Sequence, residues 1–77
     1  MKAVRKKILP CYFEEVVARR KNFEVRKDED DIHAGDTLVL CEYTDHYTGR
    51  EVFREVKCVL RKVPGYGLKE GYCIIGF

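Results

Sequence analysis

The sequence predicts a small α+β domain: a closed or nearly closed β-barrel of about five mostly antiparallel strands, with one main helix after the first strand. Apolar residues recur at helical spacing in only one stretch, near the start of the chain. After residue 22 they alternate with charged residues, which is typical of strands with one buried face. The 77 residues allow one domain spanning 1–77, and its core is thin because a chain of this size buries only about 60% of its unfolded surface.

The first two predicted elements lie within residues 6–20. Residues 6–9 can form a short strand, which Pro10 ends because proline lacks an N–H and suits the first turn of a helix. A helix over 10–20 is predicted by four apolar residues that share one face: Tyr12, Phe13, Val16 and Val17. Acidic residues stand in its first turns and basic residues in its last, which matches the helix dipole at both ends.

The segment after the helix has a period of two and predicts a strand over 22–27. Side chains alternate between the two faces of a strand, so Phe23 and Val25 share one face and Glu24 and Arg26 share the other. We expect the apolar pair to face the core and the charged pair to face solvent.

Three more strands are expected further along the chain. The acidic run 28–31 predicts a solvated loop. The β-branched and apolar residues of 37–43 indicate a strong strand. A turn at 45–49 leads into the longest alternating stretch, 50–62, and a final strand covers 72–75. In 50–62 we expect one face to be apolar, formed by Val52, Val56, Cys58 and Leu60. Arg54 falls on that face, so we expect the strand to bend or bulge midway.

Charge is segregated along the chain although the net charge is only +2. Residues 1–27 carry nine basic and three acidic side chains, whereas residues 28–55 carry two basic and nine acidic ones. The last third, 56–77, is again basic. The basic first third can attract a polyanion, but the acidic middle repels one if it lies on the same side of the molecule.

Several classes of protein are disfavoured by what the sequence lacks. No apolar run approaches the roughly 20 residues that span a bilayer, and no secretory signal stands at the start, so we expect a cytoplasmic protein with no membrane partner. The four cysteines form no C-x-x-C pair and are expected to be reduced thiols. No metal site, cofactor motif or nucleophile–base set is present, which argues against an enzyme.

The residues most suited to carry chemistry lie where the helix meets the strand 22–27. Lys21, Glu24 and Arg26 are expected to gather near the mouth of a groove between helix and barrel. Arginine can hold a phosphate through two parallel hydrogen bonds, glutamate can accept from a base edge, and lysine adds a point charge. The competing interpretation is a surface ion pair that contributes only about 0–1 kcal/mol.

The same residues resemble a family signature. Lys21-Asn22-Phe23-Glu24-Val25-Arg26 matches most of the G-x-K-x-x-E-x-R motif of ASCH domains, which are PUA-like barrels. Further segments resemble the small bacterial and phage branch of that superfamily known as DUF3850: Lys7-Ile8-Leu9-Pro10, Phe13, residues 23–27, Gly35-Asp36, Glu42-Tyr43, Thr48-Gly49-Arg50 and residues 68–72. The chain departs from the pattern at Asp30, and at Arg19, where the signature has glycine. An arginine there requires a different turn, or strain at positive φ.

The resemblance implies a cleft between helix and barrel that binds RNA or a nucleotide-like ligand. Lys21, Glu24 and Arg26 are then the ligand-binding candidates, and Lys7 is included with them. Tyr47 and Tyr66 are added because single-stranded RNA readers stack bases on exposed aromatic rings, although a tyrosine at a barrel rim often only covers the core.

Two other functions remain open at this point. Some ASCH proteins resemble amidohydrolases acting on acetylated cytidine, but Glu24 stands where their threonine nucleophile is expected, and a carboxylate is a poor substitute. The third hypothesis is a protein-interaction or regulatory module, of bacterial or phage origin, whose charge segregation serves a protein partner.

Overall fold

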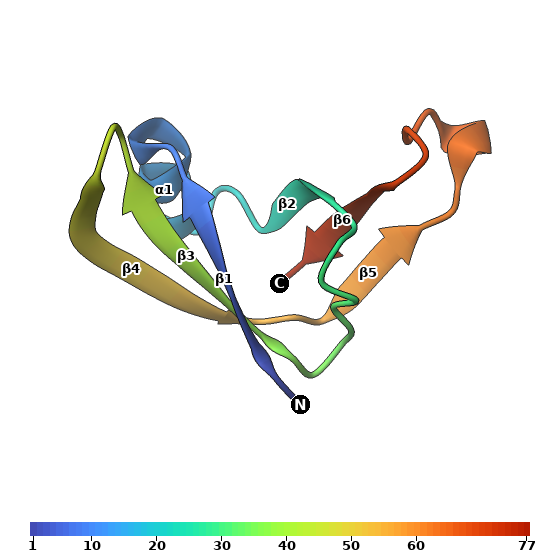
Figure 1. Cartoon of the computed structure of the whole chain (residues 1–77), viewed down its shortest axis with the longest axis horizontal. Coiled ribbons are helices and arrows are strands. Elements are labelled where there is room, and N and C mark those ends of the chain that lie inside the picture. The colour runs from blue at the N-terminus through green and yellow to red at the C-terminus, as the bar shows by residue number, and fades with distance from the viewer.

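The computed structural model describes all residues, 1–77, and contains six strands, one α-helix and one 3₁₀ turn. The elements in chain order are β1 (Ala3–Ile8), α1 (Pro10–Val17), β2 (Phe23–Lys27), β3 (Thr37–Tyr43), β4 (Tyr47–Glu55), β5 (Cys58–Arg61), η1 (Pro64–Tyr66) and β6 (Tyr72–Gly76). The strands form two sheets that diverge from a common base (Figure 1). The expected α+β class and the position of the helix after the first strand are therefore confirmed.

The first sheet has the order β1-β3-β4. β1 runs parallel to β3, from Ala3 opposite Thr37 to Ile8 opposite Glu42, and β4 is antiparallel to β3. A parallel pair needs a crossover connection, and the segment that contains α1 and β2 supplies it. α1 packs against β3 through Phe13 and Val16, which are both buried.

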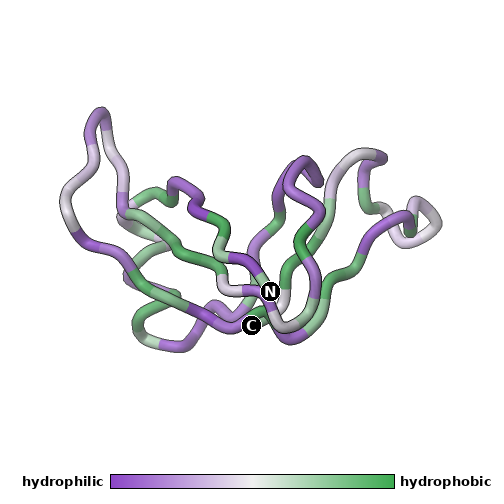
Figure 2. Tube along the Cα trace, turned by 60° about the horizontal axis from the view of Figure 1, so that its bottom comes forward, coloured by the Kyte–Doolittle hydropathy of each residue, from purple (hydrophilic) through white to green (hydrophobic).

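The second sheet has the order β2-β6-β5 and is antiparallel throughout. Its inner face and the inner face of the first sheet bury one shared core, whose members include Val16, Leu38, Leu40, Val56 and Ile75. Hydrophobic stretches, in green, lie along parts of both sheets, and the projecting loops are purple to white (Figure 2). Three of the four strand pairings are antiparallel, as the sequence predicts.

The expected closed barrel is not found, because no ladder of backbone hydrogen bonds joins the two sheets. The reason lies in the stretch 50–62, which is two strands rather than one. Val56 is fully buried at the break, and the chain passes there from the first sheet to the second. The break also shifts the alternation, so that Val59 packs against the core while Cys58 and Leu60 are exposed, contrary to expectation.

The helix ends earlier than predicted, at Val17 instead of residue 20. Arg19 adopts a φ of +62°, its N–H donates to the carbonyl of Val16, and the N–H of Arg20 donates to the carbonyl of Glu15. This pair of hydrogen bonds is the Schellman ending of a helix, whose left-handed position is usually glycine. The turn is thus made with an arginine at positive φ, one of the two outcomes expected from the sequence.

The orientation predicted for β2 is wrong. Glu24 is only 5% exposed, whereas Phe23 and Val25 are 47% and 53% exposed. The register sets Glu24 opposite Ile75, which is buried, so the charged face of β2 is the inner face of the sheet. A carboxylate can occupy this position because two cations compensate its charge, as described next.

Candidate functional site

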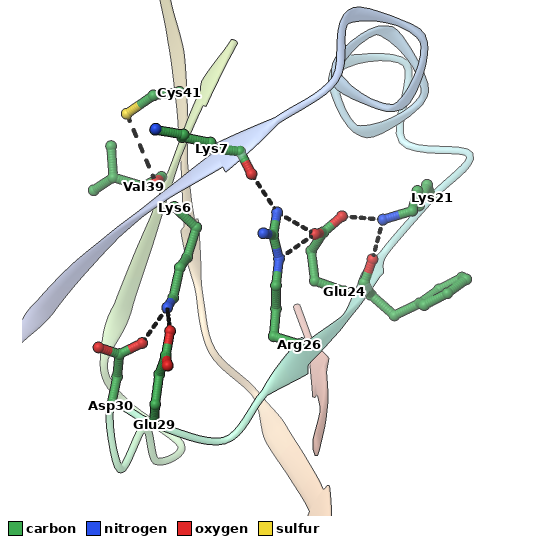
Figure 3. Close-up of polar contacts among 10 residues, drawn as sticks. Lys6, Lys7, Lys21, Glu24, Arg26, Glu29, Asp30, Val39 and Cys41 are labelled. Carbon is green, nitrogen blue, oxygen red and sulfur yellow. Dashed lines mark hydrogen bonds and ion pairs between the residues drawn. The ribbon is translucent and has the colours of Figure 1, made fainter. Parts of the chain in front are cut away.

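Glu24 lies at the centre of a three-residue ion cluster. Its Oε1 contacts the ammonium of Lys21, and its Oε2 accepts from Arg26, with Nε at 2.8 Å and Nη2 at 2.7 Å (Figure 3). Lys21 also donates to the carbonyl of Phe23 at 2.7 Å. The structure therefore brings the three predicted residues together, but around a buried carboxylate and not on a solvated face.

Arg26 connects the two sheets. Its Nη2 donates to the main-chain carbonyl of Lys7 at 2.5 Å, so a side chain of β2 meets the free edge of β1 (Figure 3). Because Glu24 orients the guanidinium, removing that carboxylate affects the seam between the sheets as well as the ion cluster. Loss of one partner from a buried ion pair typically costs about 3–5 kcal/mol.

A basic cavity of about 540 Å³ lies beside this cluster. It is formed by β1, the start of β4 and the ends of β2 and β3, and ten residues line it: Arg5, Lys6, Lys7, Arg26, Glu29, Cys41, Tyr47, Gly49, Arg50 and Glu51. Five of these side chains are basic and two are acidic, so the cavity favours an anionic ligand.

Most of the cations in this cavity already have carboxylate partners. Arg5 and Arg50 each make an ion pair of 2.7 Å, with Glu51 and Glu14 respectively. Lys6 contacts Glu29 and Asp30, which lie in the loop after β2. Its hydrogen bond with Asp30 is the main cause of its raised pKa. Arg26 is held by Glu24. These pairs fix the positions of the cations and reduce the charge they offer to a ligand.

Lys7 is the one basic residue of the cavity with no carboxylate partner. Its Nζ lies 4.3 Å from the ring centroid of Tyr43 and 5.7 Å from that of Tyr47, and its side chain points toward Cys41 of β3 (Figure 3). The two tyrosine rings meet edge to face, with centroids 4.9 Å apart. Lys7 is therefore held by ring faces, which leave its ammonium hydrogens available to an anion.

The cavity brings together three of the six residues predicted from the sequence: Lys7, Arg26 and Tyr47. Lys21 and Glu24 lie outside the lining but support Arg26. Tyr66 lies elsewhere, 83% exposed on a shallow cavity formed by η1 and the residues before it.

Sequence reasoning did not single out Arg5, Arg50 or Tyr43. A signal existed for Arg5, because Arg5 and Lys7 are two residues apart and therefore share one face of β1. Arg50 lies in the part of β4 where the register with β3 shifts, next to Gly49, which has a φ of +92°.

No group of three or more His, Cys, Asp or Glu residues is placed to hold a metal ion. The cysteines are free thiols, with Cys41 and Cys73 buried and Cys11 and Cys58 exposed. None of the helices is both long enough and apolar enough to cross a bilayer.

These observations define a small two-sheet α+β domain with a basic cavity where the sheets meet. Residues 5–77 match the family described as domain of unknown function (DUF3850), and the chain belongs to that family. The resemblance expected from the sequence is confirmed to this extent. No curated protein matches the chain.

Proposed function

We propose that this protein is a binding module for RNA or a nucleotide, and that the basic cavity is its ligand site. The observation that carries the proposal is the unpaired ammonium of Lys7 beside the half-exposed ring of Tyr47. A nucleotide offers an anion and a flat ring, and this pair of side chains complements both. The match of residues 21–26 to the ASCH signature supports the same conclusion, and we propose the domain as a PUA-like fold on that basis.

Each side chain has a distinct role in this proposal. Lys7 holds a phosphate, and Arg26 approaches the same group with the N–H bonds that Glu24 and the Lys7 carbonyl leave free. Tyr47, which is 58% exposed, stacks on the base. Lys21 and Glu24 position Arg26 and do not touch the ligand.

We propose binding and not hydrolysis of a modified nucleoside. Neither serine nor threonine lines the cavity, and its one thiol, Cys41, is buried and donates to the main-chain carbonyl of Val39. Both oxygens of Glu24 are engaged by cations. The hydroxyl of Thr48 donates to Glu42 at 2.6 Å. Acyl transfer needs a nucleophile beside a general base, and these groups do not supply that pair.

The test is a titration followed by the backbone amide resonances of the isotope-labelled protein, using adenosine and cytidine monophosphates and a short single-stranded RNA. We expect shifts at residues 5–7, 26 and 47–51. Lys7→Ala should weaken binding at least about tenfold, because a charge-assisted hydrogen bond contributes about 1.5–3 kcal/mol.

Lys27→Ala is the matched control for Lys7→Ala. Lys27 is also an exposed strand lysine with no carboxylate partner, but it lies outside the cavity. Its removal should leave binding unchanged. Equal affinities for the two variants, or shifts that avoid the cavity at millimolar nucleotide, would contradict the proposal.

The outer face of the second sheet favours a second candidate function, docking of a protein partner. Val25, Ile74 and Leu60 form a row across β2, β6 and β5, and Val25 and Leu60 are 53% and 42% exposed. Lys27 lies opposite Tyr72 in the register, and Lys69 lies over the Tyr72 ring. An apolar row beside lysines fits an acidic, apolar partner surface and repels a second copy of itself.

An acidic amphipathic peptide and its lysine-substituted counterpart serve as probes for this surface. The acidic peptide should shift the amides of β2, β5 and β6, and Leu60→Ser should weaken that binding, while Lys7→Ala should not. Equal binding of both peptides would contradict the charge argument. A dimer observed by sedimentation would indicate that a second copy of the chain, and not an acidic partner, occupies this surface.

A further inference from the structure

A second basic cavity, of about 610 Å³, lies where α1 ends and β4 leaves the first sheet. Its basic side chains are Arg19, Arg54 and Lys57, and its one acid is Glu55. It shares no residue with the cavity that contains Lys7. The proposed nucleotide site therefore does not account for it.

Arg19 and Arg54 differ from every other arginine of the chain. The other five each make an ion pair with a carboxylate: Arg5, Arg20, Arg26, Arg50 and Arg61. Arg19 and Arg54 make none, although they line the same cavity. Two guanidinium groups of like charge thus line one cavity, and neither makes an ion pair with a carboxylate.

The partners of Arg54 leave part of its hydrogen-bonding capacity unused. Its Nη2 donates to the carbonyl of Val16 at 3.2 Å, at the end of α1, and its Nη1 donates to the carbonyl of Phe53 at 2.9 Å. Its Nε is buried and has no partner. Burial lowers the pKa of Arg54, and the nearby charge of Arg19 lowers it further. An anion at this position relieves both effects.

The Schellman turn places Arg19 at this cavity at an energetic cost. A residue with a Cβ, such as Arg19, is destabilised by roughly 1 kcal/mol in the left-handed conformation, whereas glycine is not. Glycine would make a better turn but would remove one of the two guanidinium groups. One substitution, Arg19→Gly, can therefore remove the cation and still leave the turn and the fold intact.

We propose that this second cavity binds a phosphate monoester, with Arg19 and Arg54 holding the phosphate. A phosphate monoester carries close to two negative charges at pH 7, which matches the two unpaired guanidinium groups. Guanidinium also matches phosphate oxygens bidentately. Phe53 and Phe77 line the same cavity, so the ligand should carry an apolar or aromatic body that lies on their rings.

Phenyl phosphate, inorganic phosphate and benzoate are the probes for this site. Amide and arginine Nε–Hε resonances should show phenyl phosphate shifting Arg19, Arg54 and the amides of residues 53–57 and 77. Inorganic phosphate should bind more weakly because it lacks the ring, and benzoate because it carries a single charge. Binding of phenyl phosphate should weaken as the pH falls through about 6, where the dianion takes up a proton. Benzoate binding as tightly as phenyl phosphate would overturn the assignment to phosphate.

Arg19→Gly is the decisive variant, because it removes the cation and improves the turn. We expect at least a tenfold loss of phenyl phosphate affinity in a protein that is no less stable. Arg20→Ala is the matched control, since Arg20 is the neighbouring arginine and is paired with Glu15 at 2.5 Å. Arg20→Ala should leave the affinity unchanged, and equal affinities for the two variants would overturn the proposal.

A third variant separates this site from the proposed nucleotide site. Lys7→Ala should leave phenyl phosphate binding at Arg19 and Arg54 unchanged, and Arg19→Gly should leave nucleotide shifts at residues 5–7 unchanged. Phenyl phosphate shifts confined to the Lys7 cavity would overturn the second site alone. Nucleotide shifts confined to Arg19 and Arg54 would support the second site and contradict the proposed function.

Discussion

At the scale of single residues, charged side chains determine how the local structure is arranged. Glu24 is buried because Lys21 and Arg26 each contact one of its oxygens, and Arg26 then reaches the main chain of Lys7. Lys7 itself is held by aromatic rings, not by an acid. One short segment, 21–26, therefore both stabilises the fold and positions a guanidinium at the proposed ligand site.

Arg19→Gly should raise the free energy of unfolding by about 1 kcal/mol, because glycine adopts the left-handed turn without steric strain. Urea unfolding at pH 7 measures this change. Arg19→Ala is the control: it removes the same charge but keeps a Cβ, so it should not bring the gain. A similar gain in both variants would show that charge and not backbone strain is the cause.

At the scale of elements, sequence periodicity predicted where most strands and the helix lie, but not which faces of β2 and β5 are buried. Phe23 and Val25 alternate with Glu24 and Arg26, and periodicity alone favours burial of the apolar pair. The opposite holds because Glu24 pairs with the buried Ile75 of β6, so the charged face of β2 is the inner face, and local alternation does not report that long-range pairing. The break at Val56 was missed for a related reason, since it depends on which sheet each half joins.

The candidate site was predictable only in part. The sequence placed Lys21, Glu24 and Arg26 together, because they flank one helix–strand junction. It did not reveal that Tyr43 holds Lys7, because that contact joins β1 to β3 across a parallel pairing. Residues brought together by long-range pairing leave no local pattern from which a site can be deduced.

Asp36, at the residue before β3, provides a test of pH dependence at this scale. Its Oδ1 accepts from the N–H of Lys2 at 3.0 Å and its Oδ2 accepts from the N–H of His33 at 2.9 Å. These hydrogen bonds lower the pKa of Asp36 in the folded protein. The unfolded chain therefore binds the proton more readily, and the stabilisation present above about pH 4 is lost as the pH falls through the folded pKa.

Asp36→Asn should therefore lower the stability at pH 7 and flatten its decline in acid. Urea midpoints measured for both proteins between pH 2 and pH 5 check this expectation. The pair Asp28–Arg61 lowers the pKa of Asp28 in the same direction and is retained in the variant, so some acid dependence should persist. Parallel pH profiles for the two proteins would contradict a role for Asp36.

At the scale of the whole molecule, the basic and acidic segments of the sequence are brought together in space. The basic ends of the sequence contribute most cations of the two cavities: Arg5, Lys6, Lys7, Arg19, Arg26 and Lys57. The acidic middle supplies many of the carboxylates that pair with them, among them Glu29, Asp30 and Glu51. A net charge near neutrality thus coexists with local basic surfaces that can attract an anion.

Affinity for a short single-stranded RNA should fall as salt rises, because bound cations of the RNA are released on binding. Lys7→Ala should reduce the slope of log affinity against log salt by about one, as expected for the loss of one phosphate contact. Fluorescence anisotropy at salt concentrations from about 50 to about 200 mM measures both slopes. An unchanged slope would remove Lys7 from the phosphate contacts.

The seam between the sheets has a consequence for how the molecule responds to occupancy. Lys7 belongs to one sheet and Arg26 to the other, and no backbone ladder joins them there. A ligand that contacts both side chains therefore bridges the two sheets. Because such a ligand binds only while the two sheets are together, the free energy needed to separate them increases with the ligand concentration.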